Sequence, residues 1–256
     1  METYVDTSKV SLRIVSKPIA RKFVEKNHYS GRLSSCRYPI GIFYQGDNPH
    51  KFFDELEEKL IGIIAYGFPI GRRVLGSIFK EELQLDTKNI LELTRLCIYD
   101  GYGKNIESYV ISQSFKWLKK NAPDIKVLIS YADPEQKHKG GIYQATNWLY
   151  QGCGEIQMAP TFSLKLEENG EWIHSRTVYS MYGSSNSKHL ENQIGHTFWL
   201  KQEAEKHRYL YFLGNKKEMK LFMSVLKHPL LPYPKGEFKK ALIIKHEVKT
   251  KEFYEE

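Results

Sequence analysis

The sequence lacks several features that would place the protein in a special class. Its longest apolar stretches, such as residues 60–64, are far shorter than the roughly 20 apolar residues that a membrane-spanning helix needs. The first ten residues, METYVDTSKV, contain no apolar signal core, so a cytoplasmic location is expected. Three cysteines occur, Cys36, Cys97 and Cys153. Their odd number and wide spacing argue against a disulfide framework and a CxxC zinc site, and we expect free thiols.

Acidic residues are fewer than basic ones. The 256 residues include 38 Lys+Arg and 30 Asp+Glu, a formal net charge of +8. Hydrophobic residues make up 41% of the chain, enough for a packed core, which excludes a disordered protein. From Lys201 to Glu256 there are 13 basic and 8 acidic residues, so 13 − 8 = +5 of the excess lies there. A basic excess is compatible with a nucleic-acid partner, and its position predicts that the C-terminal part would hold one.

The hydrophobic pattern predicts alternating strands and helices in the first 150 residues. We expect strands at residues 11–16, 39–45, 60–68, 90–98 and 127–131, helices at 18–27, 107–120 and 142–146, and a further strand from Leu149. The run LIGIIAYGF (60–68) is apolar throughout, which is typical of a strand covered on both faces. This order predicts an α/β layer with parallel neighbouring strands.

The pattern changes after residue 160. Residues 161–166 and 171–178 are expected to form a hairpin joined by the turn Glu168-Asn169-Gly170. Residues 180–195 predict two short helical pieces around a glycine turn. We therefore expect a catalytic domain at residues 1–182 and a basic, helix-rich C-terminal extension at residues 183–256 that packs on it.

The strongest local signal follows the strand predicted at 127–131. This strand ends at Asp133, and a polar loop leads into a short helix that carries Tyr143 and stops at Asn147-Trp148. Asn at a helix end tolerates the left-handed conformation that normally requires glycine. The turn resembles the helix-to-strand turn of the GNAT-type acyltransferase superfamily, which carries a Tyr on this helix and a Gly-Phe stop.

Four sequence blocks together are similar to the Mom family of bacteriophage adenine-modification proteins. They are HYSGRL (28–33), LELTRLCI (91–98), SYADPEQKHKGGIYQATNW (130–148) and KHRYLYFLG (206–214), and they occur in the family's order. The resemblance implies a GNAT-like fold with a mixed, splayed central sheet flanked by helices. It also implies modification of adenine N6 in double-stranded DNA with a methylcarbamoyl group, which protects phage DNA against host restriction. This group is joined through a CH2 carbon, so plain acetyl transfer would not produce it.

The resemblance and residue chemistry together suggest four catalytic residues. Adenine N6 is a poor nucleophile because its lone pair is delocalised into the ring, and Asp133 is expected to orient or deprotonate it. Tyr143 would protonate a leaving thiolate or hold a carbonyl oxygen. His28 and Tyr29 are expected near the target pocket. Each has a structural alternative, since Asp-Pro is a common turn pair, tyrosines are common in cores, and His28 lies in a polar turn.

A glycine-containing loop, YDGYGKN, precedes the helix predicted at 107–120. In GNAT-type enzymes the backbone amides here hold the pyrophosphate of coenzyme A. Gly101, Gly103, Lys104 and Asn105 occupy the corresponding place and would bind acetyl-CoA or another small donor. The superfamily pattern requires a polar residue where this chain has Ile98, so a plain surface turn is an equally open interpretation.

Two arginines are candidates for contact with the nucleic acid. Arg32 is suited to a phosphate or a stacked base. Arg95 interrupts an otherwise apolar strand, so its charge must be paired, for example with Glu92, or must reach a cleft.

Lysines in the second half of the chain are the other candidates for DNA contact. Residues 176–195 resemble a helix-turn-helix, whose second helix would present Lys188. In the basic stretch 206–240, Lys216, Lys217 and Lys220 are expected to follow phosphates, unless they form a solvated helix face.

Other functions stay open at this point. His138 and His174 could join His28 and Asp133 around iron or zinc, although no HxH or HExxH spacing supports a metal site. The same fold would suit an acetyl-CoA-dependent N-acyltransferase for a small-molecule or protein amine, because a fold does not determine the substrate. A non-catalytic DNA-binding protein is the third possibility. The sequence does not determine the oligomeric state.

Overall fold

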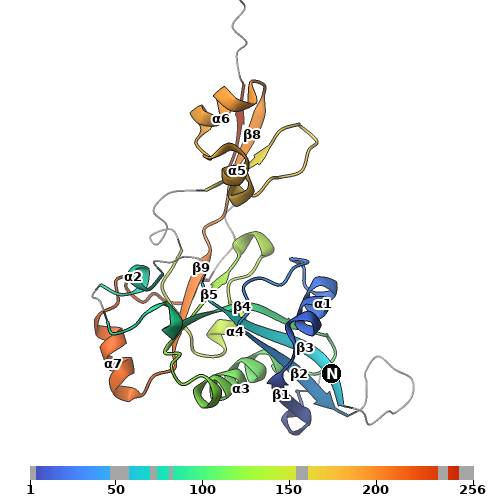
Figure 1. The fold of residues 1–256 in the computed structure, drawn as a ribbon, viewed down its shortest axis with the longest axis vertical. Coiled ribbons are helices and arrows are strands. Elements are labelled where there is room, and N and C mark those ends of the chain that lie inside the picture. The colour runs from blue at the N-terminus through green and yellow to red at the C-terminus, as the bar shows by residue number, and fades with distance from the viewer. Residues whose placement is uncertain are drawn as a thin grey trace, which may run out of the picture. The chain divides into compact units, whose positions relative to one another are not determined.

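The computed structural model describes residues 4–46, 58–69, 74–80, 83–153, 161–235 and 242–247. The chain forms two compact units (Figure 1). Unit 1 comprises Met1–Ala132, Gly140–Gly152 and His207–Tyr233, and unit 2 comprises Asp133–Lys139, Cys153–Lys206 and Pro234–Glu256.

Unit 1 is built around a seven-stranded mixed sheet. Its elements are β1 (Val10–Ile14), α1 (Lys17–Asn27), β2 (Tyr38–Gln45), β3 (Glu58–Gly67), α2 (Val74–Ile78), β4 (Ile90–Ile98), α3 (Ile106–Asn121), β5 (Val127–Ala132), α4 (Gly141–Gln144), β6 (Leu149–Tyr150), β9 (His207–Phe212) and α7 (Lys216–Ser224), with short 3-10 turns at Thr7–Lys9 and Thr87–Asn89. The strand order is β1-β2-β3-β4-β5-β9-β6. Within the described sheet only β4 and β5 run parallel, so the expected series of parallel strands is reduced to one pair. The predicted mixed α/β fold is confirmed.

Helices cover both faces of this sheet. Alternate residues of a strand point to opposite faces, and on β3 Ile64 packs in the same cluster as α3, whereas Ile63 packs with α1. On β5 Leu128 likewise belongs to the α3 cluster, whereas Ile129 packs with α2 and α7. Therefore α3 and α4 lie on one face, and α1, α2 and α7 lie on the other (Figure 1).

The parallel pair β4 and β5 separates soon after it begins. Hydrogen-bonded register extends only from Ile90–Val127 to Glu92–Ile129, whereas β4 continues to Ile98 and β5 to Ala132. Beyond this point the two strands are splayed, as the sequence resemblance implied. We call the place where this ladder ends the opening, and it lies in the middle of the sheet.

The helix stop after α4 has the predicted geometry. Asn147 adopts a left-handed conformation with φ of 58°, and Trp148 is fully buried against Tyr143 and Phe115. The indole and its aromatic neighbours anchor the turn that leads from α4 into β6.

Unit 2 combines a three-stranded sheet with two short helices (Figure 1). Its elements are a 3-10 turn at Pro134–Gln136, β7 (Phe162–Lys165), α5 (Ser175–Tyr182), α6 (Ser187–Ile194), β8 (Phe198–Gln202) and β10 (Ile243–His246), with strand order β10-β8-β7. Leu164, Val178 and Leu190 pack with two β8 residues in its core. Two helices flank the left-handed Gly183, as predicted, but the first of them, α5, begins at Ser175 and not within residues 180–195.

The structure differs from the sequence prediction after residue 160. The expected second strand at 171–178 does not form; Ile173 makes one isolated bridge to Leu164, and His174 caps α5. The expected boundary at 182/183 falls inside unit 2, and residues 207–233 return to unit 1, where β9 pairs with β5 and β6. The C-terminal part is therefore not a separate helical extension, because its apolar strand β9 is buried within the central sheet. Residues 236–241 and 248–256 lie outside the described residues.

Membrane-spanning helices and disulfides are two further features that the described part of the chain bears on. No helix there is long and apolar enough to cross a membrane. The three cysteines are free, as expected, and burial raises the pKa of Cys36 and Cys97.

Glu203 organises the polar contacts of unit 2. Its carboxylate accepts hydrogen bonds from the Ser163 hydroxyl at 2.7 Å, from the Ser175 amide at 2.9 Å and from the Ser175 hydroxyl at 2.9 Å. Burial by itself would raise the pKa of Glu203, but these hydrogen bonds and nearby His174 lower it overall. The carboxylate thereby joins β7, the end of β8 and the start of α5.

We expect Glu203→Ala to lower the opening free energy of unit 2 by roughly 1–3 kcal/mol, because buried donors lose their acceptor. Hydrogen exchange of β7 and α5 amides in the full chain measures this. Because the folded-state pKa is depressed, the stabilisation is fully present above the ordinary value of 4.5 and is lost as pH falls below it. Glu171→Ala, at an exposed position, is the control, and equal protection in both variants would contradict the assignment.

Candidate active site

Tyr143 lies at the opening between β4 and β5. Its phenol oxygen is 2.7 Å from the hydroxyl oxygen of Ser130, which is 2.9 Å from the carbonyl oxygen of Leu93. Ser130 directly follows Ile129, the last β5 residue that pairs with β4. Beyond that pair, the Ser130 side chain contacts β4 through its hydrogen bond to Leu93. Ser130 is 1% exposed and Tyr143 is 8% exposed. The phenol is therefore fixed on the serine at the edge of the opening.

Burial raises the pKa of Tyr143 to about 12. The hydrogen bond from Ser130 opposes this effect, whereas nearby Tyr29 and Glu92 add to it. At neutral pH the phenol is protonated and can donate a hydrogen bond. A hydroxyl carries one proton, so when Ser130 donates to Leu93 it can only accept from Tyr143, and when it donates to Tyr143 the phenol proton is available for another acceptor.

A loop from α1 to β2 brings His28, Tyr29 and Arg32 to the same opening. Gly67 allows this loop to approach, because a Cβ at that position would lie 2.0 Å from the Ser35 carbonyl oxygen. The Thr94 hydroxyl also donates to the Ser35 carbonyl at 3.1 Å. The loop is thus held against β3 and β4 at the point where β4 leaves β5.

Tyr29 is the exposed aromatic residue of this loop. Its ring is 65% exposed and lies 4.2 Å from the His28 ring, measured between centroids. The Ser30 amide donates to Nδ1 of His28 at 3.1 Å, so a neutral His28 carries its proton on Nε2. The His28 ring therefore packs against Tyr29, and its hydrogen bond with Ser30 also fits the alternative in which His28 is a turn residue.

Arg95 and Arg32 form a cationic pair beside Tyr29. Arg95 Nε donates to the Arg32 carbonyl oxygen at 3.0 Å, and its Nη1 donates to the Thr94 carbonyl. Burial lowers the pKa of Arg95, as does Arg32, while Tyr29 and Glu92 raise it. Arg95 is thus held by backbone carbonyls, and its charge lies near Arg32, Tyr29 and Glu92.

Asp133 belongs to unit 2 and follows β5 directly in the chain. Its carboxylate accepts from the Glu135 amide at 3.0 Å and lies 3.3 Å from the Lys206 ammonium nitrogen. These contacts fit the alternative in which Asp133 is a turn residue before Pro134. They leave acceptor capacity on the carboxylate, because each ionised carboxylate oxygen has two lone pairs.

The loop before α3 was the predicted donor site, and only part of it suits an anion. Asn105 is left-handed and makes no side-chain cap, so the first α3 amides are not capped by it. Gly103, however, is covered by the N-terminal segment, since a Cβ there would lie 2.6 Å from the Val5 amide nitrogen. The Lys104 carbonyl accepts from that Val5 amide at 3.1 Å. Glu107 also brings negative charge to the first turn. Of these predicted donor residues, Asn105 adjoins the start of α3, whereas Gly103 packs against the N-terminal segment.

The lysines expected to contact DNA are exposed but lie in different units. Lys216, Lys217 and Lys220 are on α7 in unit 1, and Lys188 is on α6 in unit 2. Among the described residues, no group of three or more His, Cys, Asp or Glu side chains is placed to hold a metal ion.

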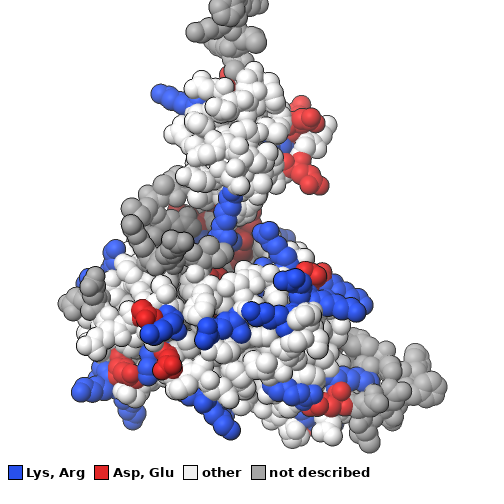
Figure 2. Space-filling view, in the orientation of Figure 1, with Lys and Arg blue, Asp and Glu red and all other residues white. Residues whose placement is uncertain are grey.

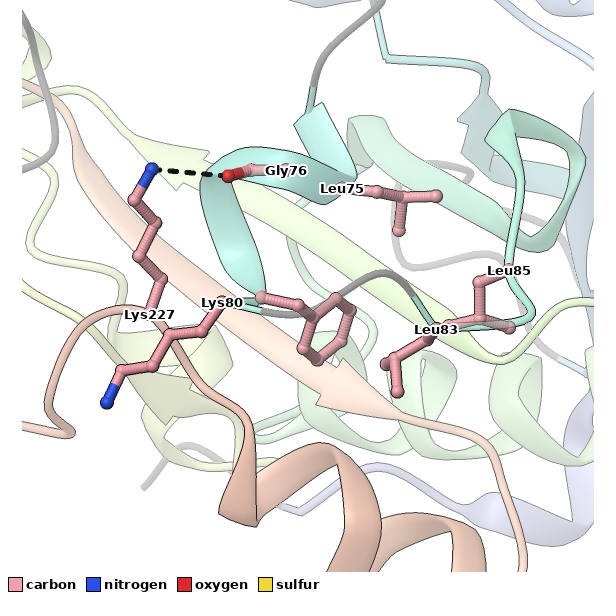
Figure 3. Close-up of a pocket in the computed structure, with 7 residues that line it drawn as sticks. Leu75, Gly76, Lys80, Leu83, Leu85 and Lys227 are labelled. Atoms are coloured by element: carbon pink, nitrogen blue, oxygen red, sulfur yellow. Dashed lines mark hydrogen bonds between the residues drawn. The ribbon is translucent and has the colours of Figure 1, made fainter.

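A cavity of about 530 Å³ lies beside α2. Its residue Phe79 packs on the face of the sheet opposite to that of Tyr143. It is lined by Leu75, Gly76, Phe79, Lys80, Leu83, Leu85 and Lys227. Figure 3 shows its leucines on one side and its two lysines extending toward the other. Among the described residues that line it there is no Asp, Glu, His or Tyr, and we do not take it as the candidate active site.

Two residues of the site were not singled out from the sequence. Ser130 appears there as one polar residue in the apolar run VLISY, and Glu92 appears only as a partner for Arg95. The polar interruption of a buried strand was the available signal, but only the splay shows that Ser130 lies against Tyr143.

The chain is similar to known proteins both in sequence and in structure. The model of the Mom protein family matches residues 9–235. The methylcarbamoylase mom of Escherichia phage Mu is 26% identical over 239 residues, which cover 90% of this chain and 85% of that protein. Among solved structures, a spermidine N-acetyltransferase from Vibrio cholerae is similar with a TM-score of 0.40 at 9% identity, over 81% of this chain and 97% of that one. Arabidopsis thaliana NAA60 has a TM-score of 0.42 at 8% identity, over 79% and 99%.

We expect Ser130→Ala to raise the pKa of Tyr143 further, because the serine hydroxyl stabilises the ionised phenol. Fluorotyrosine at position 143, titrated by fluorine NMR, reports this without an activity assay. Ser114→Ala is a matched control, since the Ser114 hydroxyl lies 2.7 Å from the Tyr66 phenol in the same core. Titration at an unchanged or lower pH in Ser130→Ala would show that the serine does not act on Tyr143.

Proposed function

Because the chain belongs to the Mom protein family, we propose that it modifies the exocyclic N6 of adenine in double-stranded DNA with a methylcarbamoyl group. The relative from phage Mu, which is named a methylcarbamoylase, supports this transferred group. The observation that carries the proposal is the protonated, buried Tyr143 at the opening between β4 and β5, with exposed Tyr29 and two arginines beside it. The modification would protect phage DNA against host restriction.

The target adenine would leave the duplex to reach this opening. Its N6 is paired inside the double helix, so an enzyme that reacts there must extrude the base. Tyr29 has an exposed ring on which a flipped base can stack. Arg32 and Arg95 would hold the neighbouring phosphate, since guanidinium groups form paired hydrogen bonds with phosphate oxygens.

In the transfer a bond forms between N6 and the CH2 carbon of the donor, the bond from that carbon to the donor's leaving group breaks, and N6 loses a proton. The leaving group takes the electron pair of the broken bond. We propose Asp133 as the acceptor of that proton, because it directly follows β5 in the chain and its carboxylate keeps acceptor capacity beside its contacts with Glu135 and Lys206. Tyr143 would donate to the atom of the donor that gains negative charge, and its pKa of about 12 keeps it protonated for this purpose. His28 would position Tyr29.

For methylcarbamoylation the donor would be a small molecule with an anionic group other than acetyl-CoA, because the acetyl group of acetyl-CoA would join N6 through its carbonyl carbon. Acetyl-CoA would be the donor in the alternative reaction, acetyl transfer. Acetyl-CoA, when bound, would supply a thioester and a thiolate leaving group. The uncapped amides at the start of α3 would hold its phosphates, and Glu107 would weaken that binding. The roles of Asp133 and Tyr143 do not depend on the choice of donor, because N6 must lose a proton in every case.

The mass of nucleosides from DNA of expressing cells tests the proposed reaction. We expect deoxyadenosine in which CH2CONH2 replaces one hydrogen, because that is the methylcarbamoyl group. A COCH3 group on adenine would instead identify an acetyltransferase. Canonical nucleosides only, from cells in which the protein is folded and abundant, would refute DNA modification.

Asp133→Asn is expected to lower the modification rate by roughly 10²–10⁴-fold, because an amide cannot accept the N6 proton. Asp86→Asn is a closely matched control. Asp86 also caps a 3-10 turn and pairs with a lysine, Lys88, at 3.1 Å. Asparagine preserves both caps. Equal rates in the two variants would show that Asp133 acts only in its turn, and single-turnover kinetics on a defined duplex measures them.

A further inference from the structure

The exposed face of α1 is strongly basic. Ala20, Phe23 and Val24 are buried against the sheet, and the cations Lys17, Arg21, Lys22 and Lys26 are all exposed. Glu25 is the one acidic residue of the helix. Figure 2 shows Lys and Arg side chains gathered over α1, with an acidic side chain among them.

These cations have no partner that explains their arrangement. Among the described residues none of the four forms an ion pair with a carboxylate. Lys17 with Arg21, and Lys22 with Lys26, are four residues apart, so each pair places like charges side by side on the helix. Such like-charge pairs cost a few tenths of a kcal/mol of helix stability each, and Glu25, four residues after Arg21, offsets part of this cost.

The position of α1 connects this charge with the candidate active site. The helix ends at Asn27, and the next residues are His28 and Tyr29. The carbonyl oxygen of Arg32, three residues after Tyr29, accepts a hydrogen bond from Arg95. The exposed side of α1, the exposed ring of Tyr29 and the two arginines therefore follow one another within unit 1.

We propose that α1 binds the phosphate backbone of the DNA duplex next to the target adenine, an inference that rests on the proposed function. An 11-residue helix is roughly 16 Å long, which is enough to contact several successive phosphates. Phosphate contacts fix a protein's position on DNA without reading sequence. Bound there, the duplex would lie beside Tyr29, which would receive the extruded base.

The test compares three variants that each remove three positive charges from one helix. The first is Arg21→Gln, Lys22→Gln and Lys26→Gln on α1. The second is Lys116→Gln, Lys119→Gln and Lys120→Gln on α3, which covers the opposite face of the sheet. The third neutralises the three exposed α7 lysines in the same way. All nine positions are exposed, so the folds should be retained. Binding to a fluorescent, unmodified duplex of about 20 base pairs is followed by anisotropy over a salt series, without donor.

We expect the α1 variant to bind roughly 10- to 500-fold more weakly at 0.1 M salt, with a salt slope smaller by about 2–3, because each lost phosphate contact removes about 0.9. The α3 variant should retain the wild-type slope. A charge-preserving variant, Arg21→Lys with Lys22→Arg and Lys26→Arg, should restore binding, which excludes misfolding as the cause.

Two outcomes would overturn the inference in distinguishable ways. If the wild type shows no salt-dependent binding to duplex DNA, DNA is not its substrate and the proposed function fails as well. If the wild type binds but the α1 variant binds as well as the α3 variant, or better than the α7 variant, DNA docks elsewhere and only this inference fails.

Discussion

The short pairing of β4 with β5 is the constraint on which the candidate active site depends. A continuous ladder would satisfy the backbone of both strands and close the middle of the sheet. Here the ladder ends at Glu92 and Ile129, and the Ser130 hydroxyl takes over the contact with β4 through the Leu93 carbonyl. That hydroxyl is also the partner of Tyr143. One serine therefore joins the strand opening to the phenol that would act in the reaction.

The opening also explains how groups from opposite faces of the sheet meet. Tyr143 packs in the core that includes α3, whereas Tyr29 and Arg32 come from the loop after α1 on the other face. Across an unbroken sheet these side chains would be separated by a layer of backbone. Because the strands diverge, Tyr29 and Glu92 lie near enough to Tyr143 to raise the pKa of its phenol.

The basic residues behind the net charge of +8 are distributed differently in the structure than their order in the sequence suggested. Counted along the sequence, more than half of it lies after residue 200, which suggested a separate basic extension. In the structure β9 from that region is a central strand, and Arg208 on β9 is almost fully buried and donates to the Ser77 carbonyl and hydroxyl. Part of the C-terminal charge thus supports unit 1, whereas α1, in the N-terminal part, exposes a group of cations that form no ion pair with any carboxylate in the described part of the chain.

Local chemistry made much of the fold predictable. The apolar run around β3, the amphipathic α3, the left-handed Asn147 and the paired helices around Gly183 each follow from side-chain periodicity or backbone sterics within a few residues. The strand expected at residues 171–178 does not form, and the reason is also local. His174 caps a helix there, and this cap competes with an alternation that suited a strand equally well.

The sequence by itself determined the mixed α/β class, the helix that carries Tyr143, and the His28–Arg32 turn as a place of interest. These depend on contacts between near neighbours and on residue types. Only the tertiary structure decided that β9 returns to the central sheet, that Asp133 lies in a different unit from Tyr143, and that Ser130 and Glu92 belong to the site. Strand order and strand divergence arise from pairing between residues far apart in the chain, and no local pattern encodes where such a pairing ends.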